Sequence, residues 1–236
     1  MTSIVRPSSG VSRAYAFPRT ERYTLGNGLT IHVATMRRLP TVTALVTIDA
    51  GAECDPLGKE GIGALTNAAM AEGTQRLDAD ALADAFERLG GTLDVDQIWT
   101  RSECSTTVLA PHFPEALRLL GEVVRTPVFP SAAIDRLRDE RLAELLQQQA
   151  EPRGLADDMF AQFVYSDESR YALPEGGHAA SVRSLTHDDV KAHYLARYAP
   201  SGADLILVGD VDAATVFHLA EEVFGDWERS VQPPPP

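Results

Sequence analysis

The chain has 236 residues, of which 44% are hydrophobic and 23% charged, a composition typical of a globular protein with one good core. Its formal net charge of −13 disfavours binding to nucleic acid and to anionic membranes, which carry charge of the same sign. The acidic balance indicates a well-hydrated surface or, alternatively, a surface that favours basic peptides. No apolar run reaches the length of a signal peptide or a transmembrane helix, so we expect a cytoplasmic protein, or a periplasmic one if a leader was removed.

The predicted elements begin after residues 1–20, a segment rich in Ser, Pro and Arg that we expect to be flexible. Two β-rich runs, Arg22–Leu25 and Leu29–Ala34, flank a Gly-Asn-Gly sequence that is typical of a hairpin turn with positive φ. The near-continuously apolar run Thr41–Ala50 predicts a central strand. After a glycine-rich stretch, an Ala- and Leu-rich run predicts a helix over Ile62–Glu72 that ends at a glycine.

The rest of the chain alternates between helices and strands. Asp78 is a suitable N-cap for a helix over Ala79–Leu89, whose apolar residues recur at i, i+3, i+4 and i+7. Strands and helices then follow in this order: strands Thr92–Trp99 and Glu103–Leu109, and helices Phe113–Val124, Ala132–Gln149 and about Leu155 to Tyr165. Thr186 and Asp189 form a capping box for the next helix, which ends near Tyr198. A buried strand at Ala203–Val208 precedes a last helix that ends near Phe224.

Strands in antiparallel-looking clusters, with pairs of helices between them, indicate an α+β fold. We expect a two-layer α/β sandwich in which helices cover a largely antiparallel or mixed sheet, forming one domain over residues 21–229. Four prolines end the chain and favour an extended spacer, so we expect a linker or tail at residues 230–236. Cys54 and Cys104 form no CxxC motif, and we expect both on strands as buried or half-buried thiols.

Six segments, taken in order, carry a resemblance to a known family. They are LGNGLTIHVATM, TIDAGAECDP, GIGALTNAAMAEGT, RLGGTLDVD, AELLQQQAEP and the stretch from SRYALPEGGH to LILVGDVD. The chain resembles the N-terminal half of a subunit of the pitrilysin/insulinase peptidases, in the branch of the mitochondrial processing peptidases, over about residues 22–228. The resemblance implies a peptidase-like α+β domain with its zinc helix at GIGALTNAAM and its substrate-edge strand at RLGGTLDVD.

Active members of this family carry H-x-x-E-H on a helix, because side chains at i and i+4 share one face and can converge on one zinc ion. Alignment on the Gly-Thr pair that follows this motif places Ala64 and Ala68 at the two histidine positions and Asn67 at the position of the general base. An alanine methyl group cannot bind a metal, and a neutral amide is no base near neutral pH. Glu144 falls at the third ligand position, either as a vestigial ligand or as an ordinary solvated or salt-bridged glutamate. The resemblance therefore implies no catalytic residue and no metal site here, with zinc expected only in an active partner.

Family proteases also bind substrate as an added strand beside the zinc helix. The resemblance places this peptide-binding edge at Gly91, Thr92, Leu93, Asp94 and Val95. The alternative is an edge strand whose carboxylates only guard against aggregation. A metal site elsewhere is disfavoured, because none of the six histidines lies three or four residues from another His or Cys.

The leading hypothesis is a non-catalytic pseudo-peptidase subunit or half-subunit, which completes the substrate chamber of an active partner in proteolysis. Its expected partners are a zinc-bearing homologous subunit or a C-terminal half of its own, and its expected ligand is a peptide. A structural scaffold unrelated to proteolysis is the first alternative. An active metallopeptidase with unconventional ligands is the second, and zinc content separates it from the others.

Overall fold

A mixed β-sheet forms the centre of the molecule. The computed structural model describes residues 10, 14, 16–166 and 169–228, and within them the strands form one six-stranded sheet in the order β1-β2-β6-β3-β5-β4. Strands β2 and β6 run parallel, whereas the other neighbours run antiparallel. The strands are β1 Glu21–Thr24, β2 Thr30–Thr35, β3 Thr41–Ile48, β4 Asp94–Gln97, β5 Ser102–Leu109 and β6 Ala203–Gly209.

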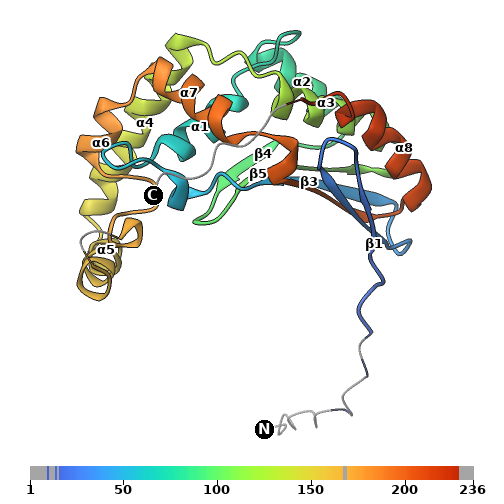
Figure 1. The fold of residues 1–236 in the computed structure, drawn as a ribbon, viewed down its shortest axis with the longest axis horizontal. Helices are drawn as coiled ribbons and strands as arrows, with labels where there is room; N and C mark the ends of the chain where they lie inside the picture. The colour runs from blue at the N-terminus through green and yellow to red at the C-terminus, as the bar shows by residue number, and fades with distance from the viewer. Residues whose placement is uncertain (1–9, 11–13, 15, 167–168, 229–236) are drawn as a thin grey trace, which may run out of the picture.

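The α-helices gather on one side of this sheet, except for α5, which stands beyond its end (Figure 1), and this confirms the expected α+β arrangement of two layers. They are α1 Ile62–Met70, α2 Ala79–Arg88, α3 Phe113–Arg125, α4 Ser131–Gln149, α5 Pro152–Val164, α6 Ala179–Ser184, α7 His187–Arg197 and α8 Ala213–Phe224. Short 3₁₀ helices lie at Ala52–Cys54, Ala110–His112, Arg170–Ala172 and Pro200–Gly202. Among the described residues, no helix combines the length and the hydropathy that crossing a bilayer requires.

Local sequence signals explain where several elements begin and turn. Gly28 adopts φ +98° in the β1–β2 hairpin, as the Gly-Asn-Gly turn requires. The Asp78 carboxylate accepts a hydrogen bond from the backbone N–H of Ala81 at 2.9 Å and so caps α2. Thr186 and Asp189 make both hydrogen bonds of a capping box at the start of α7. These three sequence predictions are confirmed.

The core lies between the sheet and the helical layer. On β3 the residues that alternate along one face are Val42, Ala44, Val46 and Ile48, and each is at most 1% exposed. Their partners on the helical side include Leu65 and Ala69 of α1, in the same cluster of buried residues. Because apolar burial is the main favourable term in folding, this packing fixes α1 against the sheet and thereby positions the site described below.

The structure corrects several predicted boundaries. Strand β4 covers only Asp94–Gln97, not Thr92–Trp99, because its pairing with β5 extends only from Asp94, opposite Ser105, to Gln97, opposite Ser102. At the other end the chain turns, with the N–H of Ile98 donating to the carbonyl of Arg101 at 2.8 Å. Helix α5 begins at Pro152 and not at about Leu155, because the N–H that proline lacks would have no partner in the first helical turn.

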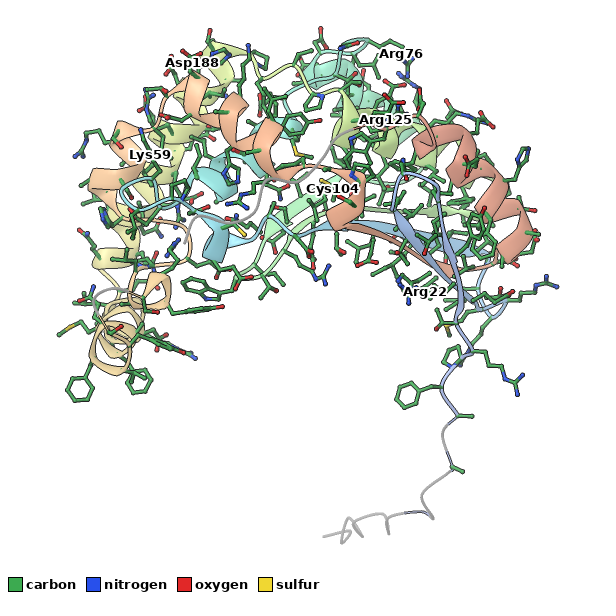
Figure 2. The ribbon with its side chains drawn as sticks, viewed as in Figure 1. Arg22, Lys59, Arg76, Cys104, Arg125 and Asp188 are labelled. Carbon is green, nitrogen blue, oxygen red and sulfur yellow. The ribbon has the colours of Figure 1, made fainter. Side chains whose placement is uncertain are left out.

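Two further predictions concern the cysteines and the chain ends. Cys104 lies buried on β5 as expected (Figure 2), whereas Cys54 ends a 3₁₀ helix and not a strand, because β3 stops at Ile48. The predicted tail at residues 230–236 and most of the predicted flexible segment 1–20 lie outside the described residues.

Candidate functional site

Helix α1 begins at a tightly constrained loop. Gly61 precedes it with φ +92°, and a Cβ there would lie 2.7 Å from the carbonyl oxygen of Gly176. The buried carboxylate of Asp55 accepts hydrogen bonds from the backbone N–H groups of Gly61 at 2.7 Å and Gly63 at 3.1 Å. Asp55 therefore caps the helix from a distance, in the place where a local Ser, Thr or Asp would normally stand.

A cleft of about 730 Å³ opens beside α1. The cleft is lined by α1, by β4, by the inner sides of α4 and α5, and by the loop at residues 173–176. Ala64 and Ala68, which the alignment places where active members carry histidine, are half-buried on the face of α1 that lines the cleft. The structure thus brings Ala64, Asn67, Ala68 and Glu144 to one cleft although α1 and α4 are far apart in the sequence.

The side chain of Asn67 forms hydrogen bonds with both β4 and β5. Its side-chain Nδ2 donates to the carbonyl of Asp96 on β4 and to the carbonyl of Glu103 on β5, the latter at 3.3 Å. Its Oδ1 accepts from the Cys104 thiol at 3.9 Å. Burial raises the pKa of Cys104 to about 12, so this side chain remains a protonated donor. An amide that is only 1% exposed thereby joins α1 to the two strands at the sheet edge.

Glu144 is the one carboxylate at a predicted ligand position. Its side chain is 65% exposed and forms an ion pair with Arg141, one turn earlier on α4, at 3.0 Å. The remaining positions carry methyl groups and a fully engaged amide. In the described part of the chain, no group of three His, Cys, Asp or Glu side chains is placed to hold a metal ion. The donor set of this cleft does not fit zinc, which takes at least three protein ligands.

The predicted peptide-binding edge falls only partly on a strand. Gly91, Thr92 and Leu93 precede β4 as an irregular segment, whereas Asp94 and Val95 are its first two residues. Among the described strands, β4 pairs with β5 alone, so its second side carries no strand. Val95, Asp96 and Gln97 line the cleft, which places this side of the sheet next to α1.

The cleft carries more negative than positive charge. Its acidic residues are Asp96, Glu140, Glu144, Asp157 and Glu175, and Arg141 is the basic residue in its lining. The pKa of Glu175 is raised by burial and by the nearby negative charge of Asp96. Carboxylates held together in this way favour a cationic ligand over an anionic one.

Arg170 holds one wall of the cleft, and the sequence analysis did not single it out. Its guanidinium donates to the carbonyl oxygens of Leu173, Pro174 and Glu175 at 3.2, 3.0 and 2.9 Å. It lies 3.4 Å from Asp55 and 5.1 Å above the ring of Trp99. Only 9% of this side chain is exposed, so Arg170 ties the loop of residues 173–176 to the start of α1.

Asp55 was also missed. Burial raises the pKa of its carboxyl to about 6, against the opposing effects of its N–H donors and Arg170. The signal in the sequence was an Asp-Pro pair just before a glycine-rich helix start, but nothing local distinguishes it from an ordinary turn.

Two family models match this chain. Residues 32–172 match the family model described as insulinase (peptidase family M16), and residues 184–236 match that of the peptidase M16 inactive domain. A probable mitochondrial-processing peptidase subunit beta of Schizosaccharomyces pombe is 26% identical over 92% of this chain and 47% of its own. Subunit 1 of the human mitochondrial cytochrome b-c1 complex is 24% identical over 95% of this chain and 46% of its own.

Solved structures share the fold. The crystal structure of a peptidase M16 inactive domain from Pseudomonas fluorescens superposes with a TM-score of 0.84 and 26% identity, over 91% of this chain and 52% of that one. The chain therefore spans about half the length of the relatives it matches.

Proposed function

This chain belongs to the insulinase family of peptidases, M16, and from that membership we propose that it is a non-catalytic half-subunit that helps to form a peptide chamber. One observation carries the proposal. On the helix that bears the zinc motif in active members, Ala64 and Ala68 offer no metal ligand, and the amide of Asn67 donates hydrogen bonds to two backbone carbonyl oxygens of the sheet. A partner that supplies zinc and the general base would then perform the hydrolysis, with this chain as one wall of the chamber.

The substrate we propose is an extended peptide with basic residues. Its backbone would add to the free side of β4, where main-chain hydrogen bonds give affinity with little dependence on sequence. Its basic side chains would meet the carboxylates of Asp96 and Glu175 in the cleft. Trp99, which also lines the cleft, lies just beyond the end of the strand and would report on a peptide bound there.

The proposal predicts that the purified chain holds less than about one-tenth of an equivalent of zinc after dialysis against a weak chelator. Zinc is measured by inductively coupled plasma mass spectrometry on protein made without a histidine tag. The variant Ala64→His/Ala68→His, which restores two imidazoles at i and i+4, is the matched control and is expected to retain more zinc. Stoichiometric zinc in the unaltered chain would refute the non-catalytic assignment in favour of an unconventional metallopeptidase.

Peptide binding is expected to depend on the charge of the cleft. A proline-free peptide of about 12 residues with several Arg and Lys residues should change the tryptophan emission of the chain, since Trp99 lines the cleft. The change is assigned to Trp99 because the other tryptophan, Trp227, is only 3% exposed. The double variant Asp96→Asn/Glu175→Gln should weaken binding about tenfold at low salt, and added salt should narrow the difference.

The matched control for this titration removes two carboxylates from an exposed helix face. Asp84→Asn/Glu87→Gln changes the net charge equally, but on α2, outside the residues that line the cleft. Its affinity should equal that of the unaltered chain. Equal weakening by both double variants would show that net charge alone attracts the peptide, and the cleft would then lose its assigned role.

A structural scaffold is the second candidate, and the likeness to a cytochrome b-c1 complex subunit favours it. The two candidates differ in the cleft. A scaffold would need no peptide in the cleft, so the absence of any saturable fluorescence change with basic peptides, together with absence of zinc, would favour this second role.

A further inference from the structure

Apolar side chains from several elements line the cleft together with α1. The methyl groups of Ala64 and Ala68 lie one helical turn apart on α1, and both line the cleft. Three further apolar side chains line the same cleft from other elements: Val95 of β4, Leu137 of α4 and Val182 of α6. We call these five residues the apolar pocket. Val182 is only 1% exposed, and Val95 and Leu137 pack against the hydrophobic core, so the walls of the apolar pocket continue that core.

The apolar pocket is a consequence of the residues that this chain carries on α1. The alignment places Ala64 and Ala68 where active members of the family carry two histidines. Two imidazole rings and a zinc ion would occupy the side of α1 that the two methyl groups leave open. Active members therefore cannot offer the same space to a ligand, and the substitutions that remove the metal ligands also create the apolar wall.

The helix that carries this wall is held in place on two sides. The amide of Asn67 joins α1 to β4 and β5, and the Asp55 carboxylate accepts hydrogen bonds from the backbone N–H groups of Gly61 and Gly63 at the start of the helix. These contacts keep α1 from moving across the cleft and closing it. A pocket whose walls are already fixed loses little conformational entropy when a ligand binds.

Two buried oxygen atoms in the lining of the cleft accept no hydrogen bond from the described part of the chain. They are Oε1 of Gln97 and Oε1 of Glu175. Nε2 of Gln97 donates to the carbonyl oxygen of Ala50 at 3.1 Å, and a Cβ added at Gly63 would overlap this nitrogen. The side chain of Gln97 therefore lies against the first turn of α1, next to Ala64. Because a buried acceptor without a donor costs free energy, these two oxygen atoms indicate a ligand that brings N–H groups.

We propose that the apolar pocket receives one large apolar side chain of the peptide that the cleft binds, while Gln97 and Glu175 accept hydrogen bonds from N–H groups of that peptide. This inference rests on the proposed function, and it adds an apolar residue to the basic residues proposed above. An extended peptide offers both features, because its N–H groups recur along the backbone and its side chains alternate between two sides. Water beside methyl groups finds few hydrogen-bond partners, so its displacement by an apolar side chain favours binding. The acidic residues of the cleft suit basic residues on either side of the apolar one.

The test compares two peptides on two forms of the chain. Both peptides have about 12 residues, no proline, and Arg and Lys residues around one central position, which is Phe in one peptide and Ala in the other. Isothermal titration calorimetry measures each dissociation constant for the unaltered chain and for Ala64→Leu/Ala68→Leu, whose larger side chains fill the apolar pocket. The unaltered chain should bind the Phe peptide about tenfold more tightly than the Ala peptide. In the filled variant this ratio should fall below about twofold, because the Phe side chain then has no pocket to enter.

Two further variants separate the apolar pocket from other effects. Ala83→Leu/Ala132→Leu adds the same bulk at exposed helix positions outside the lining of the cleft, and it should keep the tenfold preference for Phe that the unaltered chain is expected to show. Gln97→Met removes one acceptor and should weaken the binding of both peptides alike, by about fivefold, because both carry the same backbone N–H groups. Unchanged binding by Gln97→Met would overturn the role given to this acceptor.

Three outcomes would overturn the apolar pocket: equal binding of the two peptides by the unaltered chain, an unchanged ratio in the filled variant, or the same fall in the control. Thermal unfolding checks the fold of each variant, and if the filled variant melts more than about 5 °C early, the single variants Ala64→Leu and Ala68→Leu replace it in the same comparison. Binding of the Ala peptide tests the proposed function by itself. If it binds and Phe adds nothing, the apolar pocket fails while the proposed function stands; if neither peptide binds, both fail.

Discussion

Asn67→Glu is expected to lower the free energy of unfolding by about 3–5 kcal/mol at pH 8, although it restores the residue that active family members use as a base. The amide of Asn67 donates to the carbonyl oxygens of Asp96 and Glu103, and it is buried. A carboxylate in its place has no hydrogen to donate and would meet two acceptors at a position that is only 1% exposed. Urea unfolding followed by circular dichroism measures the loss.

Two companion variants separate charge from size at this position. Asn67→Asp keeps the shape of the side chain and should be destabilised as well, since it also turns a donor into an acceptor. Gln147→Glu adds the same charge at an exposed position of α4 and should change stability by less than about 0.5 kcal/mol. Unaltered stability of Asn67→Glu and Asn67→Asp would show that the amide does not hold α1 to the sheet edge.

The hydrogen bonds of Asn67 also limit what substitutions elsewhere on α1 can restore. If Asn67 has become a structural contact, then adding two histidines at Ala64 and Ala68 restores ligands without restoring a base. Catalysis would then need a change that also frees the carbonyls of Asp96 and Glu103 from their present partner. The packing of α1, as well as its missing ligands, therefore supports the proposed non-catalytic role.

Arg170→Gln is expected to cost about 3–5 kcal/mol at pH 8. The substitution removes donors to three carbonyl oxygens and the cation stacked on Trp99, and it leaves the Asp55 carboxylate buried without its countercharge. Arg118→Gln is the control, because Arg118 pairs with Glu222 at the surface and such pairs contribute less than about 1 kcal/mol. Thermal and urea unfolding, with the same probes, compare the two.

The cost of Arg170→Gln should depend on pH in a defined direction. The pKa of Asp55 is about 6 in the folded protein, above its ordinary value. Protonation of this carboxyl therefore stabilises the fold at low pH, and that stabilisation is lost as pH rises through 6. Above pH 6 the carboxylate is ionised and needs Arg170. At pH 5 it is largely protonated, so the difference between the variant and the unaltered chain should shrink. A difference that is constant from pH 5 to pH 8 would argue against this ion pair.

Much of the fold followed from local patterns. The Gly-Asn-Gly turn, the Asp78 cap and the capping box at Thr186 and Asp189 each form with the predicted partners, because all three signals act over a few residues. The order of elements also sufficed for the α+β class and for the family, which the comparisons confirm. The extent of β4 did not follow, since it depends on the register of β4 with β5, which pairs Asp94 with Ser105 and which the sequence alone does not set.

The sequence by itself determined what this cleft lacks: with alanine at positions 64 and 68 and an amide at 67, no fold can make these residues bind zinc or take a proton. Only the tertiary structure decided what the same residues do instead. The partners of Asn67 lie 29 and 36 residues away, and Arg170 meets Asp55 across 115 residues. The reason is physical. Side-chain chemistry is a property of each residue, whereas burial and hydrogen-bond partners depend on which distant segments pack together, and the apolar pocket beside α1 is visible only once that packing is known.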